Sequence, residues 1–341
     1  MLITPGMVNL LLSLDLILFK QLFDNSWYMH CHTVATIRGC GIRIRLWEYS
    51  YMKERENAMS DIVLVAETGS DIPADVANKL DIQLVPMHVS MGGQVLDDGT
   101  FPPEEVCAYY DKTGILPKTS GSSPGDFIKV FDAIHKRWPK KKILHLAYSA
   151  VTTCSYRSAI IAAEDRDYVA SIDTKQVSAG QYAVVTQMAE TLSKTPNMTL
   201  DDAVEAAKQL CKRVRMCFLP DDLEYLRAGG RVSNATCLVG RLLSIHPLIE
   251  ILDGHLIGTK KSRGSMEKLV PALIRSYSEE HNLNRKNLWM IRTIGLSDSV
   301  CKAAEDAAAD LKYRKLTWIH PGCVITTHGG PGAFGMVGVC T

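Results

Sequence analysis

The sequence predicts an α/β protein of two domains, a parallel three-layer α/β/α domain followed by a smaller mixed two-layer α/β domain. From residue 61 onward, short apolar runs alternate with helical patterns, which is typical of βαβ units. The length of 341 residues fits two domains of roughly 100–200 residues each. A composition of 46% hydrophobic and 22% charged residues is that of a globular protein.

The first domain is expected over residues 59–197. Apolar runs predict strands at residues 62–66, 82–89, 143–147 and 169–172. Helices are expected after Ser70-Asp-Ile-Pro73, from Ser123-Pro124 onward, and at about 156–164 and 179–192. Because helices separate the strands, we expect a parallel sheet that is covered on both faces.

The second domain is expected over residues 198–341, after a linker at Thr195-Pro196-Asn197. A capped helix is predicted at 199–213 and another helix at 238–243. Asp253-Gly254 predicts a hairpin turn between strands at 249–252 and 256–257. Helices at 265–280 and 298–312 alternate with strands at 288–294 and 315–319.

Residues 1–58 differ from the rest and show no clear helix or strand period. We interpret them as an upstream extension with the real start at Met59; the alternative is a genuine anchor or regulatory arm. Leu10 to Phe19 is too short to span a membrane, and no Lys or Arg precedes it as a signal peptide requires. His30, Cys31, His32 and Cys40 could hold a metal, but their spacing does not match structural zinc sites.

The charge balance and the cysteines exclude several classes of protein. Lys and Arg number 38 and Asp and Glu 37, so there is no basic surplus for binding nucleic acid. The ten cysteines form no C-x-x-C pair, a pattern that favours reduced thiols and a cytoplasmic protein.

Three nucleotide and hydrolase motifs are absent from the sequence or fail on inspection. Gly121-Ser-Ser-Pro-Gly125 fits G-x-S-x-G, but Pro124 lacks the N–H that an oxyanion hole needs. We therefore interpret Ser123 as a helix cap. No Walker loop is present, and no G-x-G-x-x-G follows the first strand.

Hydroxyl-bearing loops follow several predicted strands. They include Glu67-Thr-Gly-Ser70, Tyr148-Ser149 and Asp173-Thr174, and Thr119-Ser120 precedes a predicted helix. Ligands of open α/β sheets bind outside the carboxyl ends of the strands, where helix N-termini favour anions. The loops therefore predict a site for a small anion such as a carboxylate, although any single hydroxyl is more often a cap or turn residue.

Two further residues have alternative interpretations. His328, in Thr327-His-Gly-Gly-Pro-Gly332, is either a turn residue or a donor to the same anion. Arg231, after Gly229-Gly230, is either a solvated side chain or a bidentate donor to a carboxylate or phosphate.

Taken together, several segments resemble one family in order. They are Thr68-Gly-Ser-Asp-Ile-Pro73, Val85-Pro-Met87, 119–127, 149–159, 222–231, 242–247 and His328-Gly-Gly-Pro-Gly332. Over residues 59–341 the chain resembles the DegV family of bacterial fatty-acid-binding proteins, which includes the lipid-binding subunit of fatty acid kinase.

The resemblance implies a two-domain fold with a long-chain fatty acid in an apolar tunnel between the domains. It implies carboxyl ligands at Thr119, Ser120, Ser149 and His328, and contacts with a partner or acyl phosphate at Arg231 and Arg263. The chain would be a non-enzymatic carrier without a cofactor, in lipid metabolism. Its partner would be a separate ATP-binding fatty acid kinase subunit, with no nucleic acid and at most transient contact with a membrane surface.

The chain departs from the family pattern at several positions. Cys154-Ser155 replaces Gly-Thr, Ala150 replaces the second serine of a pair, Glu67 replaces an aspartate and His246 a lysine. Two alternatives therefore stay open. One is a serine esterase or acyltransferase that uses Ser149 and His328; the other is a carrier of a different apolar anion.

Overall fold

The computed structural model describes residues 60–221, 223–232 and 245–341, together with the backbone of two short strands near the N-terminus. The chain divides into one unit of residues 1–58 and another of residues 59–341. In the first unit β1 (Val34–Thr36) pairs antiparallel with β2 (Arg43–Arg45). The candidate metal ligands His30, Cys31, His32 and Cys40 and the helix predicted at 238–243 lie outside the described residues.

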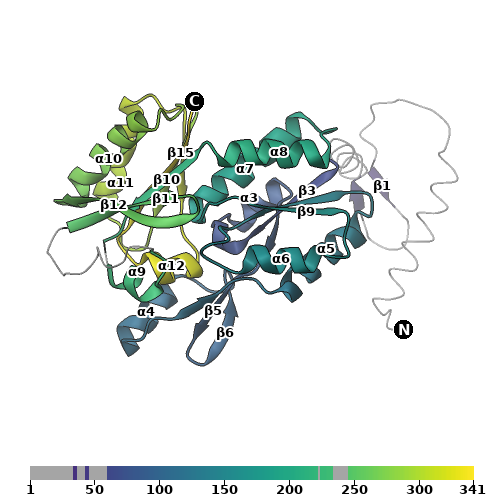
Figure 1. Ribbon diagram of the computed structural model, residues 1–341, viewed down its shortest axis with the longest axis horizontal. Helices are drawn as coiled ribbons and strands as arrows, with labels where there is room; N and C mark the ends of the chain where they lie inside the picture. The colour runs from purple at the N-terminus through teal and green to yellow at the C-terminus, as the bar shows by residue number, and fades with distance from the viewer. Residues whose placement is uncertain (1–33, 37–42, 46–59, 222, 233–244) are drawn as a thin grey trace. The chain divides into compact units, whose positions relative to one another are not determined.

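The second unit contains the predicted parallel sheet (Figure 1). In sheet order its four strands are β4 (Gln83–Val85), β3 (Ile62–Glu67), β8 (Lys142–Ala147) and β9 (Val169–Asp173). All three pairings are parallel. The βαβ interpretation of this half of the chain is therefore confirmed.

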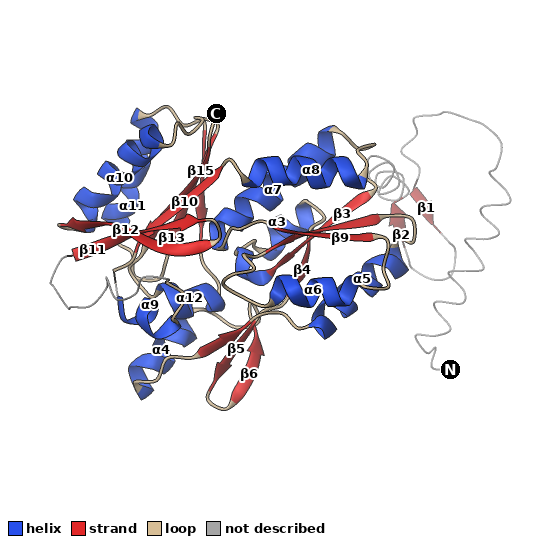
Figure 2. Ribbon diagram, in the orientation of Figure 1, coloured by secondary structure: helices blue, strands red, loops and turns tan. Residues whose placement is uncertain are grey.

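Helices cover both faces of this sheet (Figure 2). They are α5 (Pro124–Arg137) and α6 (Ser155–Ala163) on one face, with α7 (Ser178–Lys194) and α8 (Leu200–Cys211) on the other. Alternation along β3 explains the two faces, because Val63 and Val65 pack with Phe127 and Phe131 while Leu64 packs with the α7 and α8 side. Ser123 caps α5, as predicted, with its hydroxyl accepting from the Asp126 N–H at 3.3 Å.

The strand predicted at 82–89 is in fact two strands in different sheets. β4 ends at Val85, and β5 (His88–Met91) pairs antiparallel with β6 (Gln94–Asp97) and β7 (Lys118–Ser120). Pro86 separates them because it has no N–H to continue a ladder. The 3₁₀ turn η1 (Thr68–Ser70) and the helices α3 (Ala74–Lys79) and α4 (Glu104–Thr113) complete this half.

The second half of the chain is built on a six-stranded mixed sheet. In sheet order its strands are β12 (His255–Arg263), β11 (Ile245–Leu252), β10 (Val214–Leu219), β15 (Phe334–Val339), β13 (Asn287–Arg292) and β14 (Lys315–Ile319). Among the pairings of these six strands, β13–β14 is parallel and the other four are antiparallel. The hairpin predicted at Asp253-Gly254 joins β11 to β12.

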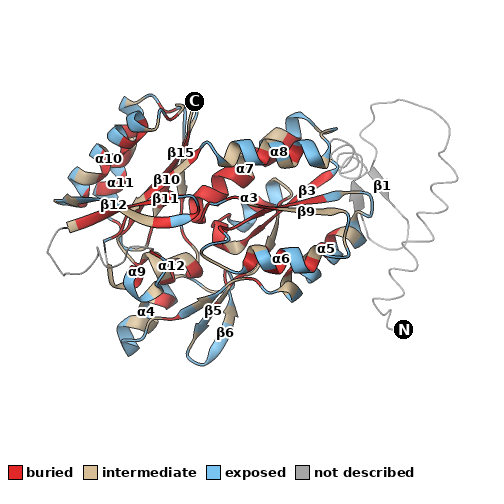
Figure 3. Ribbon diagram, in the orientation of Figure 1, coloured by how far each residue is buried: buried red, intermediate tan, exposed pale blue. Residues whose placement is uncertain are grey.

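The helices α10 (Met266–Glu280) and α11 (Asp298–Asp310) bury their apolar sides on the six-stranded sheet. Helix α7 contacts β10, β13 and β15 of this sheet as well as β3 and β8 of the parallel sheet. Its buried apolar residues belong to one cluster that includes strands of both sheets. Figure 3 shows this continuous buried zone, so α7 joins the two halves of the unit.

Two short helices, α9 (Leu223–Gly229) and α12 (Cys323–Gly329), pack on each other beside the six-stranded sheet. Helix α8 follows the linker predicted at Thr195-Pro196-Asn197 but packs against α7, β8 and β9. The elements of the six-stranded sheet therefore begin at β10, after the boundary that the sequence predicts.

Candidate functional site

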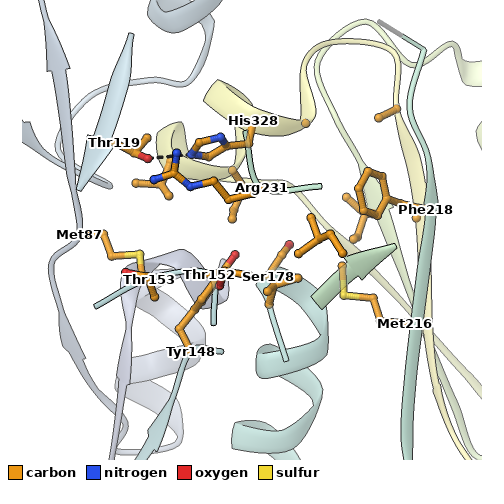
Figure 4. Close-up of a pocket in the computed structure, with 18 of the residues that line it drawn as sticks. Met87, Thr119, Tyr148, Thr152, Thr153, Ser178, Met216, Phe218, Arg231 and His328 are labelled. Atoms are coloured by element: carbon orange, nitrogen blue, oxygen red, sulfur yellow. Dashed lines mark hydrogen bonds between the residues drawn. The ribbon is translucent and has the colours of Figure 1, made fainter. Parts of the chain in front are cut away.

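A cavity lies where loops of the parallel sheet meet the six-stranded sheet and α12 (Figure 4). Its volume is about 840 Å³, counting space that is open to solvent.

Most of the cavity wall is apolar. The apolar lining residues come from both halves of the unit: Met87, Tyr148, Val177, Met216, Phe218, Leu256, Ile291, Val324, Ile325, Ala333 and Phe334. Gly335 also lines the wall, and a Cβ there would come within 2.7 Å of the Ile291 Cδ1 atom. Transfer of apolar surface from water into such a site is favourable at about 25 cal/mol per Å².

Polar groups gather where Thr119, Arg231 and His328 lie together, apart from Met216 and Phe218 (Figure 4). Thr119 is in β7 and His328 in α12. Thr119 Oγ1 lies 2.7 Å from His328 Nε2, which is hydrogen-bond distance. The structure thus joins two of the predicted ligands, and the neighbouring Ser120 lines the same cavity.

Burial keeps the His328 imidazole neutral. Desolvation, assisted by the nearby positive charge of Arg231, lowers the pKa of His328 to about 4. The His328 Nδ1 atom is buried without a hydrogen-bond partner among the described residues. A Cβ on Gly229 would lie 2.3 Å from that atom, so backbone closes this side of the ring.

These contacts indicate the tautomer of His328. A buried N–H without an acceptor costs more than a buried lone pair without a donor. We therefore assign the proton to Nε2, which donates to Thr119 Oγ1. The Thr119 O–H is then free to donate to a ligand oxygen.

Arg231 follows α9, and its exposed side chain lines the cavity. Its Nη1 donates to the Gly229 carbonyl at 2.6 Å. A guanidinium retains several further N–H donors and a permanent positive charge. Arg231 can therefore bind an anion beside Thr119 and His328.

The structure does not place Ser149 in the cavity wall. Its buried hydroxyl donates to the Gly254 carbonyl at 2.8 Å, across to the β11–β12 turn. Gly254 has φ of 86°, and a Cβ there would lie 2.6 Å from Ser149 Oγ. In this arrangement Ser149 links the two halves, and it forms no hydrogen bond with His328, whose Nε2 faces Thr119.

Arg263 is also separate from the cavity lining. It is an exposed residue that ends β12, opposite Ile245 of β11. The structure therefore brings together Thr119, Ser120, Arg231 and His328, and leaves Ser149 and Arg263 outside this group.

Four serine and threonine residues of the lining were missed by sequence reasoning: Thr152, Thr153, Ser178 and Thr293. Thr152 and Thr153 lie in the same loop as Ser149, so their nearness to that residue in the sequence could have identified them as candidates. Gly121 lets this loop approach β7 closely, because a Cβ there would lie 2.2 Å from Thr153 Oγ1. Ser178 begins α7 with φ of 44°, which no sequence pattern announces.

A cluster of buried polar side chains contacts the beginning of the loop that contains Ser149. Glu67 accepts from the Tyr148 N–H at 3.0 Å and from the Gln181 amide at 2.7 Å, and it lies 3.4 Å from His145 Nε2. Burial raises the pKa of Glu67, but His145 and these donors outweigh burial and lower it overall. The Glu67 carboxylate, one of the departures from the resembled pattern, is thus ionised and fixes the start of the loop.

The remaining departures lie near the cavity or beyond it. Cys154 is exposed where α6 begins. The Ala150 N–H donates to Asp173 at 3.2 Å, and His246 Nδ1 lies 3.0 Å from the Pro220 carbonyl.

Within residues 60–221, 223–232 and 245–341, acidic, histidine and cysteine side chains form no cluster that could hold a metal ion. No helix in this part of the chain combines the length and apolar character needed to cross a bilayer.

Comparison with known proteins places these features in context. A model of the DegV family, described as an uncharacterised protein family, matches residues 61–340. A protein from Thermotoga maritima named fatty acid-binding protein is 27% identical over 283 residues, which cover 80% of this chain and 96% of that protein.

Solved structures of DegV family proteins have the same fold as this chain. A fatty-acid-binding DegV family protein from Thermus thermophilus superposes with a TM-score of 0.74 at 26% identity, over 82% of this chain and 99% of that one. A DegV family protein from Eubacterium eligens, loaded with heptadecanoic acid, has the same fold, with a TM-score of 0.71 at 15% identity over 82% and 100% of the two chains.

Proposed function

The chain belongs to the DegV family, and on that premise we propose that it binds a long-chain fatty acid in the cavity described above. The observation that carries the proposal is the distribution of polarity in that cavity. Its wall is largely apolar, while Thr119, His328 and Arg231 gather in one place. A fatty acid has the same distribution, with one polar group on a long apolar chain.

The apolar wall supplies most of the expected binding energy. Each buried methylene contributes roughly 0.8 kcal/mol, so a sixteen-carbon chain offers about 10 kcal/mol of gross transfer free energy. Immobilisation of the ligand offsets part of this gain. Side chains such as Met216, Phe218 and Ile291 would contact the acyl chain.

The polar residues that gather at one place in the cavity can bind a carboxylate. The Thr119 hydroxyl and the Arg231 guanidinium can donate to its oxygens, and Ser120 adds a hydroxyl nearby. His328 is neutral and acts through Thr119, so Arg231 supplies the positive charge. The resemblance also predicts that Ser149 binds the carboxylate. For this, the hydrogen bond from the Ser149 hydroxyl to the Gly254 carbonyl would have to break.

We propose that the chain carries the fatty acid and does not transform it. The alternative esterase needs Ser149 beside His328, whereas their described hydrogen bonds run to Gly254 and Thr119. A separate ATP-dependent kinase subunit would phosphorylate the presented carboxylate, whose oxygen attacks the γ-phosphate to give an acyl phosphate and ADP. The exposed Arg231 at the cavity supports contact with such a partner or with the acyl phosphate, and Arg263 is a second candidate.

We further propose that this activity is cytoplasmic. The seven described cysteines are unpaired, and burial raises the pKa of several of them, including Cys211 and Cys323 to about 12. Thiols in this state suit a reducing compartment.

Native mass spectrometry of the full chain tests the proposal. We expect a co-purified fatty acid that is released on denaturation and identified by extraction. Delipidated protein should then bind hexadecanoic acid more tightly than hexadecane, which lacks the carboxylate. Protein that is empty and takes up neither compound would contradict fatty-acid binding, and extraction of a different apolar anion would favour the other carrier hypothesis.

A further inference from the structure

Helix α12, which carries His328 near its end, begins against two buried carboxylates from the first half of the unit. The Gly322 N–H donates to Asp71 Oδ1 at 2.8 Å. The Cys323 N–H donates to Asp98 Oδ1 at 2.8 Å, and the Val324 N–H donates to the same atom at 3.3 Å. Three successive amides at the start of α12, from its N-cap Gly322 onward, are therefore held by residues more than 200 positions away.

The two carboxyl groups also contact residues that line the cavity. The Ser178 hydroxyl donates to Asp71 Oδ2, and Ser178 lines the cavity. Val324, whose N–H donates to Asp98, lines it as well. Space beside Asp98 is limited, since a Cβ on Gly322 would lie 2.9 Å from Asp98 Oδ1.

We propose that Asp71 and Asp98 are positioning residues for the headgroup site, which fix the first turn of α12 and thereby hold His328 against Thr119. We call this pair the carboxylate clamp. The inference rests on the proposed function, because it assigns the clamp a role in binding the fatty-acid headgroup. Neither residue needs to contact the ligand for this role.

The clamp is electrostatically unusual. The donors to Asp71 and Asp98 are backbone amides and hydroxyls, which are neutral. Desolvation, with a smaller effect from the charge of Asp98, raises the pKa of Asp71 to about 8, and burial also raises the pKa of Asp98. Near neutral pH Asp71 is therefore protonated, and the two carboxyl groups do not carry two full negative charges.

Other titratable groups surround the pair. Tyr148, which follows β8, and Glu67, in β3, lie nearby, and the pKa of Tyr148 is raised by burial and by the charges of Asp71, Glu67 and Asp98. Cys323 of α12 and Glu104 and Glu105 of α4 lie on the Asp98 side. These neighbours are neutral or negative near pH 8, so they do not neutralise a second negative charge.

A pH dependence follows from this geometry. Raising the pH through about 8 ionises Asp71 beside Asp98, and the like charges loosen the start of α12. The affinity for the fatty acid should therefore fall above pH 8. The carboxyl of a monomeric fatty acid is ionised throughout this range, as is arginine, so neither causes the fall.

Binding of hexadecanoic acid by the delipidated full chain, measured calorimetrically at pH 7, tests the clamp. Asp98→Ala removes the acceptor of two amides and should weaken binding about 10-fold or more. Asp98→Asn keeps an oxygen acceptor and should stay within about 3-fold of the wild type. Asp97→Ala is the matched control, because Asp97 is adjacent in sequence but pairs with His88 away from the clamp.

The dependence of fatty-acid affinity on pH distinguishes a role in positioning His328 from a general contribution to folding. The wild-type affinity should fall between pH 7 and 9.5, whereas Asp71→Asn, which cannot ionise, should show a flat profile. This measurement stands even where Asp98→Ala does not fold. Equal pH profiles in the two proteins would overturn the proposal.

Hydrogen exchange of the ligand-free protein distinguishes failure of the clamp from failure of the proposed function. Peptides that cover residues 320–329 should exchange faster in Asp98→Ala than in Asp98→Asn and the wild type. Wild-type protein that binds no hexadecanoic acid contradicts the proposed function and, with it, a role of the clamp in binding. Wild-type protein that binds it, together with equal affinity or equal exchange in the two Asp98 variants, overturns the clamp alone.

Discussion

Thr119 Oγ1 and His328 Nε2 are 2.7 Å apart, although 209 positions separate the two residues in the sequence. The contact joins a short strand of the first half to a helix near the end of the second. Because the neutral imidazole donates to the hydroxyl, the threonine proton is directed to another acceptor. The histidine therefore orients a donor, and it need not carry charge to bind an anion.

Replacement of Thr119 by valine should weaken binding of hexadecanoic acid about 5- to 15-fold. The change keeps the side-chain shape but removes one hydrogen bond, worth roughly 1–1.5 kcal/mol. Titration calorimetry measures the effect, with Thr186→Val as a control because the Thr186 hydroxyl bonds within α7. Unchanged affinity in Thr119→Val would remove Thr119 from the headgroup site.

The stability of the protein should depend on pH through His328. The pKa of His328 is about 4 in the folded protein and near 6.5 when the residue is exposed, so the unfolded chain binds more protons between these values. The free energy of unfolding should therefore fall as the pH drops from 6.5 to 4. Urea unfolding at several pH values should show a shallower fall in His328→Gln, and parallel curves would contradict a neutral buried imidazole.

Ser149→Ala should cost stability more than affinity. The change removes the hydrogen bond to Gly254, which we expect to lower the free energy of unfolding by about 1 kcal/mol. Because Ser149 does not line the cavity, fatty-acid affinity should change less than 2-fold. A loss as large as that of Thr119→Val would instead support the predicted contact between Ser149 and the carboxylate.

The two arginines should differ in their effect on binding. Arg231→Gln removes the positive charge at the cavity and should weaken fatty-acid binding about 3- to 10-fold, with the larger loss at low salt. Arg263→Gln serves as the comparison and should leave affinity unchanged, because Arg263 ends β12 away from the cavity lining. Equal effects of the two changes would argue against Arg231 as the counter-ion.

Affinity should rise with acyl chain length until the cavity is full. Each added methylene should tighten binding roughly 4-fold, which corresponds to about 0.8 kcal/mol. A series from decanoic to octadecanoic acid measures the slope and its end. An affinity that does not vary with length would show that the apolar wall does not hold the chain.

Local patterns in the sequence predicted much of the fold. Apolar runs located the four parallel strands, and Asp253-Gly254 located a hairpin. The patterns failed where long-range packing decides the structure. The β15 segment contains Gly335 and Gly338, which disfavour an isolated strand, yet Gly335 fits because Ile291 and Phe218 leave no room for a Cβ.

The candidate site was predictable in part for the same reason. Motif resemblance identified Thr119, Ser120, Arg231 and His328, which all line the cavity. It did not reveal the direction of the Ser149 hydroxyl, because the Gly254 carbonyl that accepts from it comes from the other half of the chain. Thr152, Thr153 and Ser178 line the cavity through backbone turns that the sequence does not display.

The position of β15 has a consequence for synthesis of the protein. This strand comes last in the chain but lies inside its sheet, between β10 and β13. While the ribosome is still translating residues 334–339, β10 and β13 each present an unpaired edge, which is where non-native association begins. Truncation before residue 334 would therefore remove the centre of the sheet, and the cavity, whose wall includes Phe334 and Gly335, forms only after this strand has been synthesised.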